Sequence, residues 1–539
     1  MWRPSSPHLT SAPIPASLPP MHLIDALIIL AYFAVVMAVA VRARLRGPVS
    51  ADDLFLSGRN LRWWTIAAST IATNLHAGHF LAVIGSAYAF GLAQANFELN
   101  AVLGLLLAAF VFVPLYLRAG VTTITQFFEL KFGAATATTY SLLSMFLYGA
   151  LYLGATLFWG GYALEVFFGD AVQAAVGGEA LVRIAVMIVL LGGFSATYTY
   201  FGGLGAVVKT DVVQFLLLLG GGLTVTFLAV DRLGGWSQFQ AQTGHLLHLH
   251  LPNDHEQLPW LGIVAMNLLN LQYWGANQVI LQRSLAARSL RDAQIGLLVG
   301  GAFKFVTAAM LVLPGIALAG ILGREGALDD PDQAYVRIVE LLLAPGVRGL
   351  VLCGLFASLM SSVDSILNSI STLWAVDIYK RRLRPHADEA AVVRAGRRAV
   401  LGVTLVGVLF GFAFAYVKLE NPSVPLDPLF KKISYFIKNG FVVLIAAAVF
   451  LKEPPRRLVL GALIFMVPFT VGVNLLWAGT PYLILTSLII VTGFLVVAVP
   501  TWARSGWRVG PLVESTGALP AGLGALLFAV LVALHVGFH

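Results

Sequence analysis

Charged residues are scarce in this sequence. Only 11% of its 539 residues are Asp, Glu, Lys or Arg, against about 25% in an ordinary soluble domain. Hydrophobic residues make up 58%, and the mean hydropathy is +0.85. A protein dissolved in water needs more charge than this to cover its surface. The composition therefore excludes a soluble enzyme and a disordered chain, and it favours a protein embedded in a lipid bilayer.

Cysteine is almost absent as well. The single cysteine, Cys353, cannot form an internal disulfide, which excludes a secreted scaffold held together by disulfides. The sequence also has no Walker phosphate-binding motif and no HExxH, GxSxG or kinase signature. Without these motifs we expect neither ATP-driven transport nor an enzyme, and we expect no cofactor.

The formal net charge of +8 fits a membrane topology and does not indicate nucleic-acid binding. If the N-terminus lies outside, most Lys and Arg residues fall on one set of alternate loops, with the densest run from Lys380 to Arg398. A bias of this kind marks the cytoplasmic side of a membrane protein. We therefore expect a multi-pass protein of the cell (inner) membrane, with both termini outside and no nucleic-acid partner.

Long apolar stretches predict the membrane spans. Crossing the hydrocarbon core takes about 20 predominantly apolar residues, and a helix satisfies its own backbone groups in lipid. The stretches do not alternate as barrel strands do, so we predict an all-α polytopic membrane protein with about 14 transmembrane helices. Residues 1–21 are rich in Pro and Ser, and we expect them to form a disordered tail. The predicted spans are residues 22–42, 64–88, 98–117, 137–166, 183–202, 207–230, 260–280, 295–322, 347–377, 399–417, 426–451, 458–478, 481–501 and 518–538.

Two of these spans are interrupted by polar residues. One contains ATNLHAGHF, from Ala72 to Phe80, and the other contains NLQYWGANQ, from Asn270 to Gln278. Unwound backbone at membrane depth is tolerated where it lines a cavity. Interruptions at corresponding positions of two halves are typical of transporters built from inverted repeats. A kinked structural helix is the alternative for either interruption alone.

The interruptions also divide the chain into two halves. Each stands near the start of a block of five spans, and because five is odd, the second block is inverted relative to the first. We therefore predict a 5+5 inverted-repeat core, with one repeat at residues 64–230 and the other at 260–451. A peripheral first helix at 22–42 and three peripheral helices within 458–538 complete the prediction.

Ionisable residues inside the spans are candidates for function, because a charge in the bilayer is costly. Lys304 has apolar stretches on both sides and needs a partner, for which Glu98 is the candidate. Glu98 and Asp211 each open a span, so either can instead be an interfacial residue whose side chain reaches water.

Three serines share one face of the predicted span at 347–377, because Ser358, Ser361 and Ser362 are spaced i, i+3, i+4. Their hydroxyls can join helices, or they can bind a small hard cation together with the carbonyls of an unwound helix. Uncharged oxygens suit weak, reversible binding of a monovalent ion such as Na⁺. Zinc, calcium and magnesium prefer thiolates, imidazoles or several carboxylates.

Several stretches, collinear along the chain, resemble the sodium:solute symporter family. The closest resemblance is to the branch of the sodium/glucose cotransporters and a bacterial sodium/galactose symporter. It implies the ten-helix core of the leucine-transporter-like fold. The stretches are DDLFLSGRNLRWW from Asp52, ATNLHAGHF from Ala72, NFELNA from Asn96, YFGGLGAVVKTDVVQ from Tyr200, NLQYWGANQVILQRSLAARS from Asn270 and ASLMSSVDSILNSISTLWAVDIY from Ala357.

The resemblance also implies roles for individual residues. One sodium ion is expected between the first interrupted helix and the helix that carries the serines. Its ligands would be the backbone carbonyls of Ala72 and Leu75 and the hydroxyls of Ser358, Ser361 and Ser362, with Asp211 near the ion. The substrate is expected at Asn74, His79, Glu98, Asn270 and Lys304, and the gate at Tyr273 and Trp274.

One position departs from the family pattern. Sugar carriers of this branch have a glutamine on the tenth core helix, where this sequence reads LFKKISYFIK and has Ser434. We expect Ser434 at the substrate site, and the surrounding lysines, Lys431, Lys432 and Lys438, leave two alternatives open. Either the substrate is an organic anion such as a sugar acid or sialic acid, or the first two lysines lie at the external helix end and reach water.

The sequence thus predicts a sodium-coupled secondary active symporter that imports a small polar organic solute by alternating access. A sugar or polyol is favoured, because carboxylate, amide, imidazole and ammonium groups form directional hydrogen bonds to hydroxyls. A carrier for an organic anion is the alternative. A protein of another functional class, namely a membrane solute sensor or an uncoupled facilitator, is a further alternative. It would have similar solute-binding residues without ion coupling.

Overall fold

The computed structural model describes residues 22–44, 50–76, 78–323, 328, 330–421, 426–506 and 513–538. The tail predicted at residues 1–21 lies outside them. Every regular element in these ranges is a helix, and the remaining β-type pairing is limited to isolated bridges. The predicted all-α class is therefore confirmed.

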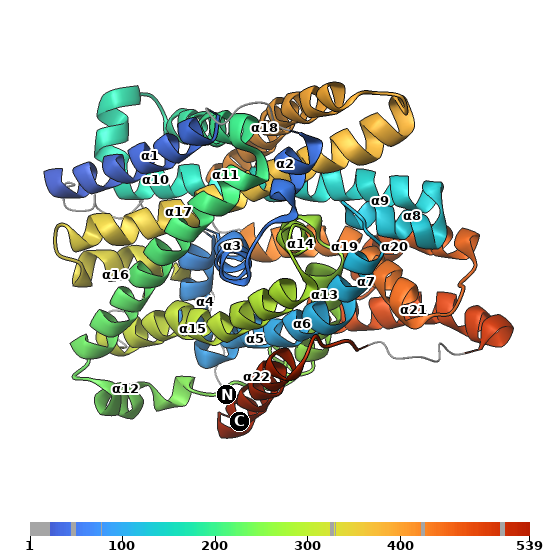
Figure 1. Cartoon of the computed structure of the whole chain (residues 1–539). Helices are drawn as coiled ribbons and strands as arrows, with labels where there is room; N and C mark the ends of the chain where they lie inside the picture. The colour runs from blue at the N-terminus through green and yellow to red at the C-terminus, as the bar shows by residue number, and fades with distance from the viewer. Residues whose placement is uncertain are drawn as a thin grey trace.

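The helices follow one another with short connections (Figure 1). Their bounds are α1 Leu23–Arg44, α2 Ala51–Leu56, α3 Trp63–Asn74, α4 Ile84–Phe90, α5 Asn96–Leu99, α6 Ala101–Leu107, α7 Val113–Arg118, α8 Ile124–Phe132, α9 Ala134–Phe146, α10 Leu153–Val176, α11 Ala180–Arg232, α12 Trp236–Thr243, α13 Gly262–Gly275, α14 Gln278–Leu285, α15 Leu290–Leu322, α16 Ala334–Leu342, α17 Val347–Thr372, α18 Glu389–Glu420, α19 Leu426–Phe450, α20 Arg456–Leu476, α21 Tyr482–Ser505 and α22 Ala518–Gly537. Wider π-helical turns continue some of them, namely η2 His79–Val83, η4 Ala108–Phe112, η5 Leu147–Tyr152 and η8 Leu373–Leu383.

Among the described residues, 10 helices are long and apolar enough to cross a membrane. Each predicted range overlaps helical segments, but several ranges merge or divide. The helical stretch His79–Arg118 covers parts of two predicted spans. The helices beside the interruptions, α3, α13 and α14, are too short to be counted as spans by themselves. Multiple membrane crossings are thus supported, while the number of 14 stays a prediction.

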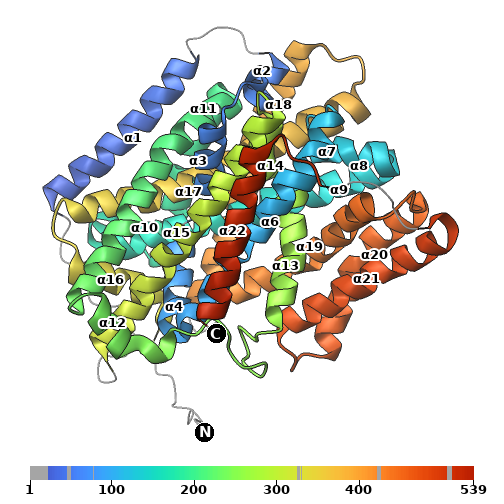
Figure 2. The ribbon, with the colours of Figure 1, turned by 60° about the horizontal axis from the view of Figure 1, so that its bottom comes forward.

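Both predicted interruptions are present in the structure. α3 ends at Asn74, Leu75 has extended backbone with φ −89° and ψ 125°, and helical structure resumes before α4. α13 ends at Gly275, and the Asn277 side chain accepts a hydrogen bond from Val279 N to begin α14. Asparagine favours this capping position because its oxygen satisfies a free amide of the first turn. α3 and α14 both lie inside the bundle (Figures 1 and 2).

The connection predicted between residues 202 and 207 is not a loop. α11 continues through it with a kink at Gly203, whose φ is +54°. A Cβ on this residue would lie 2.5 Å from the carbonyl oxygen of Leu54 in α2. Glycine permits both the left-handed backbone and the close approach, so a kinked helix replaces the expected turn.

The end helices cover opposite parts of the bundle. α1 lies at one edge and packs against α11 and α17, where the Asp25 carboxylate accepts hydrogen bonds of 2.7 Å from Gly346 N and Gly349 N. α20 and α21 lie at the opposite edge, and α22 crosses α15 (Figures 1 and 2). The interrupted helices are therefore enclosed between these outer elements.

Candidate functional site

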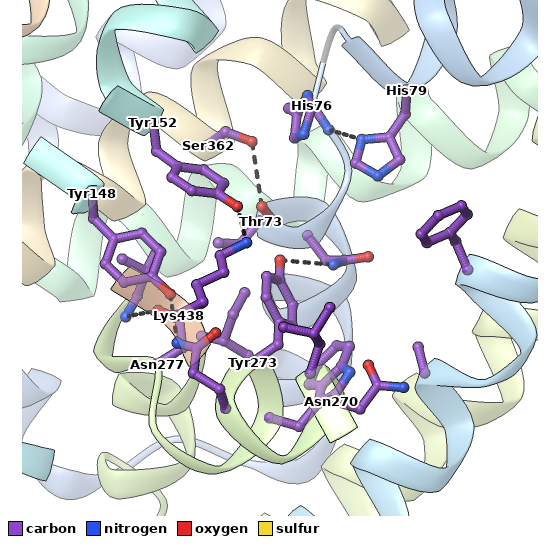
Figure 3. Close-up of a pocket in the computed structure, with 18 of the residues that line it drawn as sticks. Thr73, His76, His79, Tyr148, Tyr152, Asn270, Tyr273, Asn277, Ser362 and Lys438 are labelled. Carbon is purple, nitrogen blue, oxygen red and sulfur yellow. Dashed lines mark hydrogen bonds between the residues drawn. The ribbon is translucent and has the colours of Figure 1, made fainter. Parts of the chain in front are cut away.

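A cavity of about 200 Å³ lies beside the interruption of α3. Its walls come from α3, η2, α5, α6, η5, α10, α13, α14, α15, α17 and α19, so segments from most of the chain meet there (Figure 3). This volume is below the ~300–1,000 Å³ usual for drug-sized ligands, which suits a small solute. The site residues predicted from the sequence that line it are Asn74, His79, Glu98, Asn270, Tyr273, Trp274, Lys304 and Ser362.

A buried ion pair forms one wall of this cavity. The Lys304 ammonium lies 2.5 Å from Glu98 Oε2, and the two residues are only 1% and 5% exposed. Lys304 also donates to the side-chain oxygen of Asn74, and His79 Nε2 lies 3.7 Å from the other Glu98 oxygen. The predicted partnership of Lys304 and Glu98 is thus confirmed, and it brings four predicted substrate residues together.

Amide and phenol groups also line the cavity. Asn74 Nδ2 donates to the Tyr273 hydroxyl over 2.8 Å, which joins α3 to the end of α13 (Figure 3). Asn270 Nδ2 donates over 2.9 Å to the carbonyl of Asn100, so this amide also holds α13 against the α5–α6 junction. The predicted gate residue Tyr273 therefore contacts a predicted substrate residue directly.

Trp274 is held in place by close packing. The indole is 1% exposed, and a Cβ on Gly104 of α6 would lie 2.1 Å from its ring. The Lys304 ammonium lies 5.8 Å from the ring centroid, within the range of a cation–π contact. Gly104 is needed here because any side chain would displace the ring.

On α19 the structure differs from the prediction. The Ser434 hydroxyl donates over 2.8 Å to the carbonyl of Lys431 in its own helix, and Ser434 is absent from the cavity lining. Tyr435 and Lys438 line the cavity in its place. A serine side chain is short and bonds readily to the preceding turn, whereas the lysine chain is long enough to reach the cavity.

The predicted sodium residues come together only in part. The Ser362 hydroxyl lies 3.3 Å from the carbonyl oxygens of both Thr73 and Leu75, at the end of α3. Ser358 donates over 2.7 Å to the carbonyl of Leu355, one turn earlier in its own helix. Ala72 is buried two residues before the end of α3, and Ser362 contacts the carbonyl of Thr73 there.

Asp211 belongs to a buried network rather than to the membrane interface. Its carboxylate accepts hydrogen bonds from Ser361 and Ser69 and lies 3.5 Å from the guanidinium of Arg283. Asp211 and Arg283 are both fully buried. The interfacial alternative for Asp211 is therefore wrong, and Arg283 is a buried partner that the sequence did not reveal.

Several lining residues were not predicted. They include Thr73, His76, Tyr148, Tyr152, Gln272 and Asn277. Gln272 Nε2 donates over 2.9 Å to the Tyr148 hydroxyl, which ties α13 to η5. The i, i+4 spacing of Tyr148 and Tyr152 puts both phenols on one helix face, and this pair of tyrosines in an apolar span was the available signal.

Comparison with known proteins gives concordant results. The model of the sodium:solute symporter family matches residues 54–421. A sodium/glucose cotransporter of Vibrio parahaemolyticus is 32% identical over 477 residues, which cover 80% of this chain and 86% of the relative. The sodium/glucose cotransporter 4 of Mus musculus is 31% identical over 468 residues, covering 80% of this chain and 66% of that protein.

A solved structure shares the fold. The outward-open, substrate-bound state of a Na⁺-coupled sialic acid symporter aligns with a TM-score of 0.76 and 19% identity, covering 90% of this chain and 99% of that one. These relatives are transporters and not enzymes, and their likeness supports sodium as the coupling ion of a multi-pass membrane protein. This chain, with its two interrupted helices meeting at a polar cavity, belongs to the sodium:solute symporter family.

Proposed function

We propose that this protein imports a sugar or polyol together with sodium ions. The observation that carries the proposal is the buried Lys304–Glu98 pair, which shares a small cavity with Asn74 and His79. Groups of this kind donate and accept hydrogen bonds in fixed directions, as the hydroxyls of a sugar require. The cotransporters of Vibrio parahaemolyticus and Mus musculus that resemble this chain are named for glucose.

The sodium ion is proposed to bind where α17 passes the end of α3. Ser362 and the carbonyls of Thr73 and Leu75 already converge there. We include Ala72, Ser358 and Ser361 as further ligands, which requires the hydroxyls of the serines to turn from their present acceptors. Unwound carbonyls and hydroxyls are the ligands with which discontinuous helices bind sodium in transporters.

Import is proposed to proceed by alternating access within a 5+5 inverted-repeat core of about 14 spans. The repeats are residues 64–230 and 260–451, with 22–42 and 458–538 peripheral. The protein is assigned to the cell membrane, with both termini outside. Tyr273 must break its hydrogen bond to Asn74 when the cytoplasmic gate opens. The membrane potential supplies about 2.3 kcal/mol per sodium ion at 100 mV.

Uptake into proteoliposomes tests this proposal. Purified full-length protein would be reconstituted and offered labelled glucose, galactose, myo-inositol, N-acetylneuraminate and hexuronates, with an inward gradient of either sodium or potassium. We expect accumulation above the external concentration with sodium only. Equal uptake with both cations would identify an uncoupled facilitator. No uptake of any of these solutes, with sodium-dependent binding retained, would favour a sensor.

A further inference from the structure

We propose that an anionic phospholipid binds in a groove between α11 and α18, with one acyl chain in the groove and the phosphate at Arg397. This inference goes beyond the proposed function, because it concerns the outer surface of the protein and a component of the bilayer. The groove has a volume of about 540 Å³, and residues of both helices line it. α11 and α18 pack side by side there (Figure 1).

The lining of the groove forms one stripe on each helix. On α18, Leu401, Thr404 and Val408 follow one another at intervals of three and four residues, which puts them on one helix face. On α11 the lining residues run from Val189 to Tyr200 at the same intervals. Between these two residues the helix rises by about 16 Å, roughly half of the ~30 Å hydrocarbon core. The groove therefore has the length of one leaflet.

The groove suits a hydrocarbon chain, because even its threonines require no polar ligand. The Thr197 hydroxyl donates over 2.7 Å to the carbonyl of Gly193, and the Thr404 hydroxyl donates over 2.8 Å to that of Val400. Beside them, Leu401 and Leu405 are 54% and 61% exposed. An exposed apolar groove between spans marks a site for an apolar ligand.

One end of the groove carries positive charge. The guanidinium carbon of Arg397 lies 5.7 Å from the ring centroid of Tyr200, which lines the groove at that end. Arg397 forms no ion pair with any described residue, and its Nε has no hydrogen-bond partner among them. Arg394 and Arg398, on the same end of α18, are exposed and also lack a described acidic partner.

These arginines select the head group. A guanidinium matches the geometry of a phosphate and can bind two of its oxygens at once. The ammonium of a zwitterionic phospholipid would be repelled by the neighbouring arginines, so a head group with a net negative charge is favoured. The run from Lys380 to Arg398 lies on the side that we propose to be cytoplasmic. Basic pockets between spans on that side are known to bind anionic lipid head groups.

Photolabelling with a reactive lipid tests the inference. The full chain would be reconstituted in phosphatidylcholine with a small fraction of phosphatidylglycerol that carries a diazirine in its acyl chain, and labelled peptides would be identified by mass spectrometry. We expect saturable labelling within residues 189–201 and 401–408. Added unlabelled phosphatidylglycerol should displace the label, whereas further phosphatidylcholine should not.

Two variants separate the acyl chain from the head group. Gly193→Leu should abolish this labelling, because its side chain would fill the groove. Nothing in the protein lies within 4 Å of a Cβ at Gly193, and leucine is a better helix former than glycine, so the variant should fold. Arg397→Gln should weaken the affinity for phosphatidylglycerol about fivefold, the effect of one arginine near an anionic lipid.

Each variant has a matched control. Gly220→Leu lies on the same helix, also with nothing within 4 Å of a Cβ, but outside the groove. Arg504→Gln removes an exposed arginine from the end of α21. Both should bind the lipid as the wild type does.

Three results would overturn the inference. They are labelling spread evenly over the lipid-facing helices of the wild type, displacement by phosphatidylcholine as effective as by phosphatidylglycerol, and undiminished labelling in Gly193→Leu. None of them bears on the proposed function, because the readout does not depend on solute uptake. The wild-type competition decides even if the variants misfold.

Discussion

At the scale of single residues, the ion pair of Lys304 and Glu98 is the most demanding feature of the protein. Its atoms lie 2.5 Å apart, and both residues are buried. Taking two charges out of water is costly, and the attraction between them compensates only while both are present and hydrogen-bonded. Thr307 Oγ1, 3.3 Å from Glu98 Oε2, and Asn74 supply such further bonds.

Removing one member of the pair should therefore destabilise the protein strongly. We expect Lys304→Met to lower the free energy of unfolding by on the order of 3–5 kcal/mol and to abolish solute uptake. The double variant Glu98→Gln/Lys304→Met should recover most of the stability and none of the uptake. Thermal unfolding in detergent and uptake measure the two effects. A wild-type unfolding temperature for Lys304→Met would show that the pair does not support the fold.

A site residue was predictable where its type, at its position in a span, by itself required a partner. Lys304 and Glu98 were predictable, because a lysine inside an apolar run needs an acid. Arg283 was not, because its position after an interrupted helix resembles a cytoplasmic loop, whereas its guanidinium turns inward to Ser69 and Asp211. Ser434 was placed at the substrate site by its position alone, and its side chain bonds to its own helix.

At the scale of elements, the kink of α11 decides how two predicted spans join. Gly203→Ala should destabilise the protein by at least ~1–2 kcal/mol, the cost of a left-handed backbone at a residue with a Cβ, and the contact with Leu54 adds to it. Gly220→Ala on the same helix is the control, because nothing lies within 4 Å of its Cβ, and it should be neutral or stabilising. Equal unfolding temperatures for both variants would contradict this account of the kink.

A second element-level contact joins α8 to η8. Glu129 Oε1 accepts a hydrogen bond of 2.8 Å from Arg382, and Arg381 binds the other oxygen. Partial burial by itself would raise the pKa of Glu129, but the bonds and charges of Arg382 and Arg381 outweigh it and hold the pKa below its ordinary value of 4.5.

This contact predicts a dependence of stability on pH. Because the folded-state pKa of Glu129 is lowered, its contribution is present above pH 4.5 and is lost as the pH falls through the folded-state pKa. Glu129→Gln should lower the unfolding temperature at pH 7, and the difference from wild type should shrink on acidification. The measurement is thermal unfolding in detergent between pH 7 and pH 3. If the difference in unfolding temperature between Glu129→Gln and wild type did not depend on pH, the charge of Glu129 would not contribute to stability.

The two helix interruptions were predictable because polar residues stand there inside otherwise apolar spans. ATNLHAGHF and NLQYWGANQ put amides and histidines into apolar spans, and both sites are interrupted in the structure. The path of α11 was not predictable, because a glycine pair between two apolar runs fits a turn as well as a kink. Only the position of the Leu54 carbonyl, set by α2, distinguishes the two.

At the scale of the whole molecule, the proposed ion site and the solute cavity share residues. Thr73 and Ser362 line the cavity, and they also meet at the end of α3 where sodium is proposed to bind. Binding at either site therefore directly affects residues of the other site. Coupled transport requires that the two ligands favour each other's binding, and this effect is reciprocal.

The most direct test of the account is sodium-dependent stabilisation of the purified full chain. A ligand that binds only the folded state raises stability with its concentration. We predict that NaCl, compared with KCl at the same ionic strength, raises the unfolding temperature of the wild type. The control Ser371→Ala, whose hydroxyl bonds within α17, should show the same rise. Ser362→Ala should need far more sodium for it. An identical sodium response in Ser362→Ala and wild type would contradict the proposed ion site.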